Sequence, residues 1–99
     1  MNIKKITDRK DWNDKDAKQL IALWFQFMSF QVNAEKYQKA APVRLLAELQ
    51  GRSKGSIEAK LMNVSAVMVK NGHAFVKGYK PLSNYNRELE SQVLKFMSK

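Results

Sequence analysis

Basic and small polar side chains cluster between residues 52 and 80, and their chemistry suits contacts to a polyanion. This span holds a single acid, Glu58, against six cations: Arg52, Lys54, Lys60, Lys70, Lys77 and Lys80. Lys and Arg supply most of the affinity of proteins for nucleic acids, because they displace the counterions condensed on the phosphates. The span therefore predicts a nucleic-acid interface.

The helix expected after Ser53 carries the side chains that could read or position DNA. Ser53 is a good N-cap, and the free amides of a helix start can receive a phosphate. Lys60 and Asn63 have the chemistry to read guanine and adenine edges in a major groove. Glu58 could accept a hydrogen bond from cytosine or pair with Lys54 at i, i+4, and the pair is the preferred interpretation. The predicted contact residues are Arg52, Ser53, Lys54, Ser56, Lys60, Asn63, Lys77 and Lys80.

The residues that enzymes use are sparse. The chain has one histidine, His73, and no cysteine, so thiolate metal sites and disulfides are excluded. Asp14 and Asp16 are two positions apart, which does not put them on a shared helix face. The glycines at 51 and 55 do not match a phosphate-binding loop. We expect a non-enzyme with no catalytic residue, metal or cofactor.

Length and charge limit the remaining choices. Ninety-nine residues suffice for one core, and the net charge of +9 indicates a polyanionic partner. No apolar run reaches the 18–20 residues of a membrane span, and no signal peptide is apparent. We expect no membrane association and a cytoplasmic protein, nucleoid-associated or phage-encoded in a bacterial cell. Residues 1–10 are expected to form a flexible arm, and residues 11–99 a single helical nucleic-acid-binding domain.

Apolar periodicity and capping residues predict the elements that position this surface. Asn13 can cap a helix whose apolar positions recur at i, i+3, i+4 and i+7 as far as Gln31. A second helix, about 41–50, has Pro42 in its first turn and Gly51 at its end. A third follows Ser53 and stops at residues 71–72, and a fourth, about 85–98, follows a possible cap at Asn84. Residues 73–81 are expected to form a short irregular or ribbon segment.

These elements predict an all-α fold, a small bundle of about four helices with a helix-turn-helix-like core. Trp12 and Trp24 are assigned to the core. Phe75 and Tyr79 could stack on bases or plug the core. The first helix also has more apolar surface than one core needs, which makes a homodimer through its phenylalanines a hypothesis; these are Phe25, Phe27 and Phe30.

Two blocks, 51–68 and 71–85, resemble the N-terminal non-catalytic domain of bacterial HNH endonucleases and related restriction proteins. The resemblance covers roughly residues 11–97. It implies a DNA-handling accessory domain with a helix-turn-helix-like core. It carries over Arg52, Ser53, Ser56, Lys60 and Asn63 as contact candidates, and residues 78–81 as a loop that positions the DNA backbone.

The expected function is that of a DNA-binding accessory module that binds duplex DNA through a basic helix face. The partners would be DNA and a nuclease domain or subunit. RNA is less favoured, because the sequence offers neither an aromatic platform nor a GxxG clamp. The alternative is a small inhibitor or protein-interaction module that targets a nuclease or another nucleic-acid-binding protein.

Overall fold

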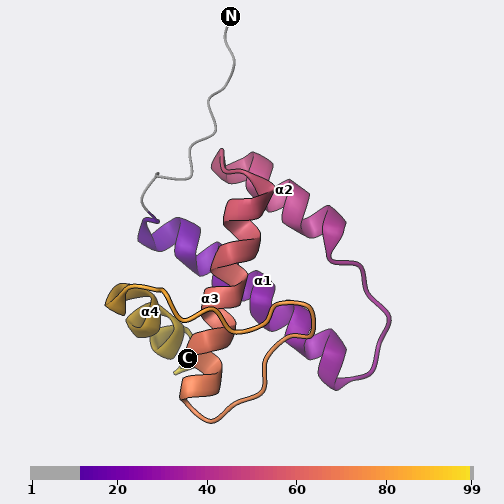
Figure 1. The fold of residues 1–99 in the computed structure, drawn as a ribbon. Coiled ribbons are helices and arrows are strands. Elements are labelled where there is room, and N and C mark those ends of the chain that lie inside the picture. Colours follow the sequence, from indigo (N-terminus) through magenta and orange to yellow (C-terminus); the bar gives the residue numbers. More distant parts are fainter. Residues whose placement is uncertain (1–11, 99) are drawn as a thin grey trace, which may run out of the picture.

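Helix α3 (Lys54–Lys70) lies at the centre of the molecule and packs against the other three helices, α1 (Asp14–Val32), α2 (Ala40–Gln50) and α4 (Arg87–Met97) (Figure 1). The computed structural model describes residues 12–98, and this part of the chain contains no strand. The predicted all-α bundle of four helices is confirmed. The predicted flexible arm, residues 1–10, lies outside the described residues.

The helix starts follow from local capping chemistry. The Asn13 side chain accepts a hydrogen bond from the Asp16 amide at 2.7 Å, and Ser53 Oγ accepts one from the Ser56 amide at 3.0 Å. Each cap satisfies an amide that has no partner inside its own helix. Both were predicted. The predicted cap at Asn84 is wrong, because Asn86 caps α4 by accepting from the Leu89 amide at 3.0 Å.

A short glycine turn joins α2 to α3. Gly51 adopts the left-handed conformation with φ at 65°, which lets the chain leave α2 and re-enter a helix three residues later. The Arg52 amide closes the turn by donating to the Ala47 carbonyl at 2.9 Å. The expected helix–turn–helix connection is therefore present.

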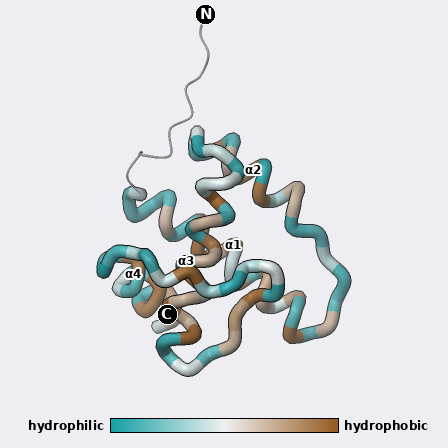
Figure 2. The backbone as a smooth tube through the Cα atoms, viewed as in Figure 1, coloured by the Kyte–Doolittle hydropathy of each residue, from teal (hydrophilic) through white to brown (hydrophobic). Residues whose placement is uncertain are grey.

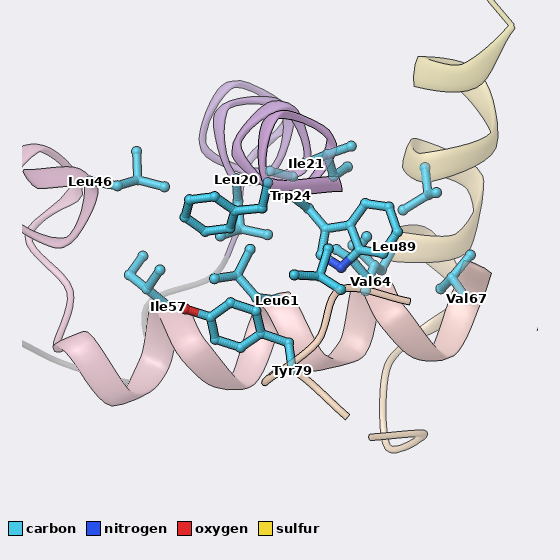
Figure 3. Close-up of a cluster of buried hydrophobic side chains, with 14 of the residues drawn as sticks. Leu20, Ile21, Trp24, Leu46, Ile57, Leu61, Val64, Val67, Tyr79 and Leu89 are labelled. Carbon is cyan, nitrogen blue, oxygen red and sulfur yellow. The ribbon is translucent and has the colours of Figure 1, made fainter. Parts of the chain in front are cut away.

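Large side chains of α1 and α3 form the middle of the core (Figure 3). Trp24, Leu61 and Val64 are fully buried, and burial of each such side chain stabilises the fold by about 1.5–3 kcal/mol. The indole N–H of Trp24 donates to Ser65 Oγ at 3.0 Å, so the buried ring leaves no polar atom unsatisfied. This pair fixes the register of α1 against α3.

The phenylalanines expected at a dimer face are used inside the molecule. Phe27 belongs to the core, Phe25 stacks on Phe96 with ring centroids 5.1 Å apart, and Phe30 stacks on Tyr37 at 5.4 Å. Two of the three phenylalanines of α1 therefore pack against other parts of the same chain, Phe25 against α4 and Phe30 against the connection that follows α1. The homodimer through these residues stays a prediction, which their stacking inside the molecule does not favour.

The 71–86 connection forms an irregular layer over α3, with no helix or strand in it. The Leu82 amide donates to the Met62 carbonyl at 3.1 Å, and Asn63 Nδ2 donates to the Leu82 carbonyl at 2.6 Å. Val76 and Tyr79 point into the core. The irregular alternative for residues 73–81 is confirmed, and the covering layer itself was not predicted.

Within residues 12–98, no helix combines the length and the apolar character needed to cross a lipid bilayer.

Two glycines at the α2–α3 turn predict stability changes of opposite sign. Gly51→Ala forces an L residue into the left-handed region and should lower the free energy of unfolding by about 1 kcal/mol. Gly55 lies inside α3, where an added Cβ meets only Ser53 Oγ at 3.9 Å, so Gly55→Ala should raise it by about 0.5–1 kcal/mol. Urea unfolding measures both. Equal effects of the two variants would contradict the assigned conformations.

Candidate nucleic-acid interface

Arg52 is a structural residue rather than a surface cation. The residue is 1% exposed, and its guanidinium forms an ion pair with Asp16 at 3.0 Å. Arg52 Nε donates to Gln50 Oε1 at 3.1 Å, and the guanidinium lies 3.6 Å from the ring centroid of Trp12. A buried charge must be paired to be tolerated. Asp16 of α1 and Gln50 of α2 bind the guanidinium, so the structure does not present Arg52 to a phosphate as predicted.

Asn63 is also withdrawn from the surface. The residue is 8% exposed, and its amide nitrogen donates to the Leu82 carbonyl and to Asn84 Oδ1 at 3.4 Å. The side chain fastens the 71–86 connection to α3 and cannot reach a base edge. The structure does not present Asn63 for the predicted recognition of adenine.

Lys60 is half-buried beside the same aromatic ring as Arg52. Lys60 Nζ lies 5.3 Å from the Trp12 ring centroid. Burial lowers the pKa of Lys60 below the usual lysine value, and the neighbouring positive charge of Arg52 lowers it further. These surroundings favour an interior packing role, although Lys60 was predicted to read guanine.

The two serines divide their roles. Ser53 Oγ caps α3, as expected, by holding the Ser56 amide, so that amide is no longer available to a phosphate. Ser56 itself is half-buried in the first turn of α3. The predicted Lys54–Glu58 pair does not occur among the ion pairs of residues 12–98. Glu58 instead lies near Tyr79, where burial first and the charge of Glu58 second raise the pKa of the phenol.

Three of the predicted contact residues are exposed: Lys54, Lys77 and Lys80. Lys54 lies at the start of α3, beside a groove of about 290 Å³ that Arg44 and Glu48 of α2 also line. Lys77 and Lys80 lie on the 71–86 connection. The predicted set is therefore divided between two places and does not form one face of α3.

Two residues that the sequence did not indicate hold the part of the 71–86 connection that carries Lys77 and Lys80. Gln31, at the end of α1, donates from Nε2 to the Phe75 carbonyl at 3.1 Å and accepts from the Lys77 amide at 2.8 Å. Lys39 Nζ donates to the Lys77 carbonyl at 2.7 Å and lies 5.2 Å from the Tyr79 ring centroid. Gly78, with φ at 97°, leaves the space that the Lys39 ammonium enters. No local pattern indicates such contacts between distant segments.

These contacts bring the 33–39 connection, mostly hydrophilic in Figure 2, against the 71–86 connection. Together they carry a group of four lysines that we call the lysine junction: Lys36, Lys39, Lys77 and Lys80. Within residues 12–98, carboxylates form ion pairs only with Arg52 and Lys70, so none neutralises the junction by direct contact. Glu35 precedes Lys36 in the sequence. Glu58 lies close enough to Tyr79, between Gly78 and Lys80, to affect the pKa of its phenol.

The aromatic side chains give the junction no stacking platform. Tyr79 is buried and lies 6.1 Å from Phe27, ring centroid to ring centroid, and Phe75 is half-buried. The interpretation of Tyr79 as a core residue is confirmed, whereas Phe75 packs against the edge of the core. Within residues 12–98 every Trp, Tyr and Phe is at least half-buried.

No group of three or more His, Cys, Asp or Glu residues that could hold a metal ion occurs between residues 12 and 98. His73 is exposed in the loop that follows α3.

Comparisons with protein-family models, with curated proteins and with solved structures found no match.

The structural role of Arg52 predicts a contrast with its neighbour. Arg52→Ala leaves Asp16 buried without the guanidinium and should lower the free energy of unfolding by about 3 kcal/mol. Lys54→Ala removes an exposed side chain and should change it by less than about 0.5 kcal/mol. Urea unfolding of both variants tests this. An Arg52→Ala protein as stable as the parent would show that the ion pair is not structural.

Proposed function

We propose that the protein is a non-catalytic module that binds duplex DNA through phosphate contacts of the lysine junction. The observation that carries this proposal is the contact of Lys39 with the Lys77 carbonyl, which joins two connections that also carry Lys36 and Lys80. Within residues 12–98 no carboxylate forms an ion pair with any of these four lysines. Cations held near one another without acidic partners attract a polyphosphate strongly, and the net charge of +9 adds long-range attraction.

The surroundings of the junction favour a duplex over a single strand. Proteins that bind single-stranded nucleic acids stack bases on accessible aromatic rings. Within residues 12–98 no aromatic side chain is exposed, and all except Phe30, which stacks on Tyr37, belong to the core or pack against it, so few rings are open to bases. Contacts to the regularly spaced phosphates of a duplex need only the ammonium groups.

The burial of Asn63 favours binding without sequence preference. Base readout requires side chains that reach the edges of base pairs, whereas phosphate contacts position a protein without reading sequence. Asn63 is bound to Leu82, and Lys60 lies beside Trp12. Helix α3, which was predicted to read base edges, therefore presents no side-chain amide to a DNA groove. The exposed lysines of the junction suit phosphate contacts of this kind.

A charge-reversal experiment tests the location of the interface. Lys36→Glu/Lys77→Glu/Lys80→Glu leaves the structural lysine Lys39 in place and should abolish duplex binding at moderate salt. The matched control is Lys15→Glu/Lys18→Glu/Lys95→Glu, which changes the net charge equally at exposed positions on α1 and α4. Fluorescence anisotropy with a labelled duplex at several salt concentrations measures both.

Each phosphate contact contributes about 0.9 to the slope of log affinity against log salt. The junction variant should therefore flatten this slope by about 2.7, and the control variant should keep the slope of the parent protein. Equal loss in the two variants would show that net charge alone drives binding. A parent protein that binds no duplex at low salt would contradict the proposed function.

A second comparison separates this proposal from the alternative of an inhibitor that targets a nuclease. A DNA-binding module should prefer duplex to single-stranded DNA and RNA, and its affinity should fall steeply with salt. A tight complex with a nuclease that varies little with salt, together with no binding to free DNA, would favour the inhibitor.

A further inference from the structure

A groove of about 370 Å³ runs between α1 and α2 and is lined only by uncharged residues. Leu23 and two glutamines, Gln19 and Gln26, form its α1 side, and Pro42, Leu45 and Leu49 form its α2 side. In a chain with a net charge of +9, a surface of this size without a charge is unusual. Depletion of charged residues is the compositional mark of the centre of a protein interface.

The α2 side of the groove presents a row of exposed leucines. Leu45 is 58% exposed and Leu49 is 69% exposed, and the two lie one helical turn apart on the same face. Adjacent apolar side chains left in water favour an association that buries them.

The charges beside this row are arranged to match a second copy of the same helix. Arg44 and Glu48 each precede one of the leucines, both are exposed, and neither forms an ion pair within residues 12–98. In an antiparallel pair of α2 helices with Leu45 opposite Leu49 of the second copy, Arg44 lies opposite position 50 of that copy. Glu48 of the second copy is then only two residues away, about 3 Å along the helix axis.

A twofold axis makes this match occur twice. The axis of an antiparallel pair is perpendicular to the plane of the two helices, so the Arg44–Glu48 flank of each copy stays on the same side of that plane. Both arginines then face glutamates across the interface. A symmetric pair of α2 helices thus combines apolar burial with complementary charges, and the same surface serves on both copies.

We propose that the protein self-associates through α2 as an antiparallel, twofold-symmetric dimer, with Leu45 and Leu49 at its centre and Arg44 paired with Glu48 of the second copy. The remaining positive charge opposes association only weakly, because at physiological ionic strength charges are screened beyond about 8 Å. The eleven residues of α2 span about 16 Å. This length is short for an interface of about 800 Å² per partner, so the dimer is a reversible one with a dissociation constant of roughly tens of micromolar.

Sedimentation equilibrium of the full chain tests self-association directly. The average mass should rise from the 11.4 kDa of one chain toward twice that value as the concentration increases from micromolar to near-millimolar. Leu45→Glu should keep the protein monomeric throughout. The matched control is Leu94→Glu, which changes another exposed leucine, 42% exposed on α4, and should leave the mass profile of the parent.

Charge exchange tests the register of the two helices. Arg44→Glu and Glu48→Arg should each weaken the dimer at least tenfold, because each places like charges opposite one another, and the double variant should restore it. Thermal melts at low concentration check that each monomer folds. A parent protein that stays at 11.4 kDa at all concentrations overturns the proposal. A dimer that neither single charge reversal weakens, or that the double variant fails to restore, overturns it as well.

Discussion

The hydrogen bond from Asn63 to the Leu82 carbonyl is the contact on which the arrangement of the molecule depends. It fastens an irregular connection along α3, and the Leu82 amide strengthens the attachment by donating to Met62. The connection thereby covers Asn63, a position that a recognition helix would need to keep open. The same connection contributes Val76 and Tyr79 to the hydrophobic core.

Packing also decides which cations face the solvent. Arg52 is enclosed between α1 and the α2–α3 turn, where it neutralises Asp16, and it is unavailable to phosphate. Lys77 and Lys80 are displayed on the outside of the layer, and Gln31 and Lys39 hold that part of the chain in place. A binding surface built on loops is positioned by the rigid elements beneath it. The proposed interface therefore follows from packing, although its residues lie on connections.

Much of the fold could be predicted because helix ends and apolar stripes are local. Asn13 and Ser53 each cap a helix through an amide three residues away, and Gly51 ends α2 by its own conformation. The residues that contact DNA were harder to predict, because the exposure of a side chain depends on segments far apart in the chain. Arg52 meets Asp16 across 36 positions, and Asn63 meets Leu82 across 19. A helical pattern identifies the polar face of α3 but cannot show that a later segment covers it.

Amide chemical-shift changes during titration with an unlabelled duplex would test most directly which surface of the folded protein meets DNA. The account predicts changes concentrated at residues 36–39 and 77–80, with residues 54–63 of α3 nearly unaffected. Changes that follow the exposed turns of α3 while both connections stay unperturbed would contradict it, since α3 would then be the element that contacts DNA.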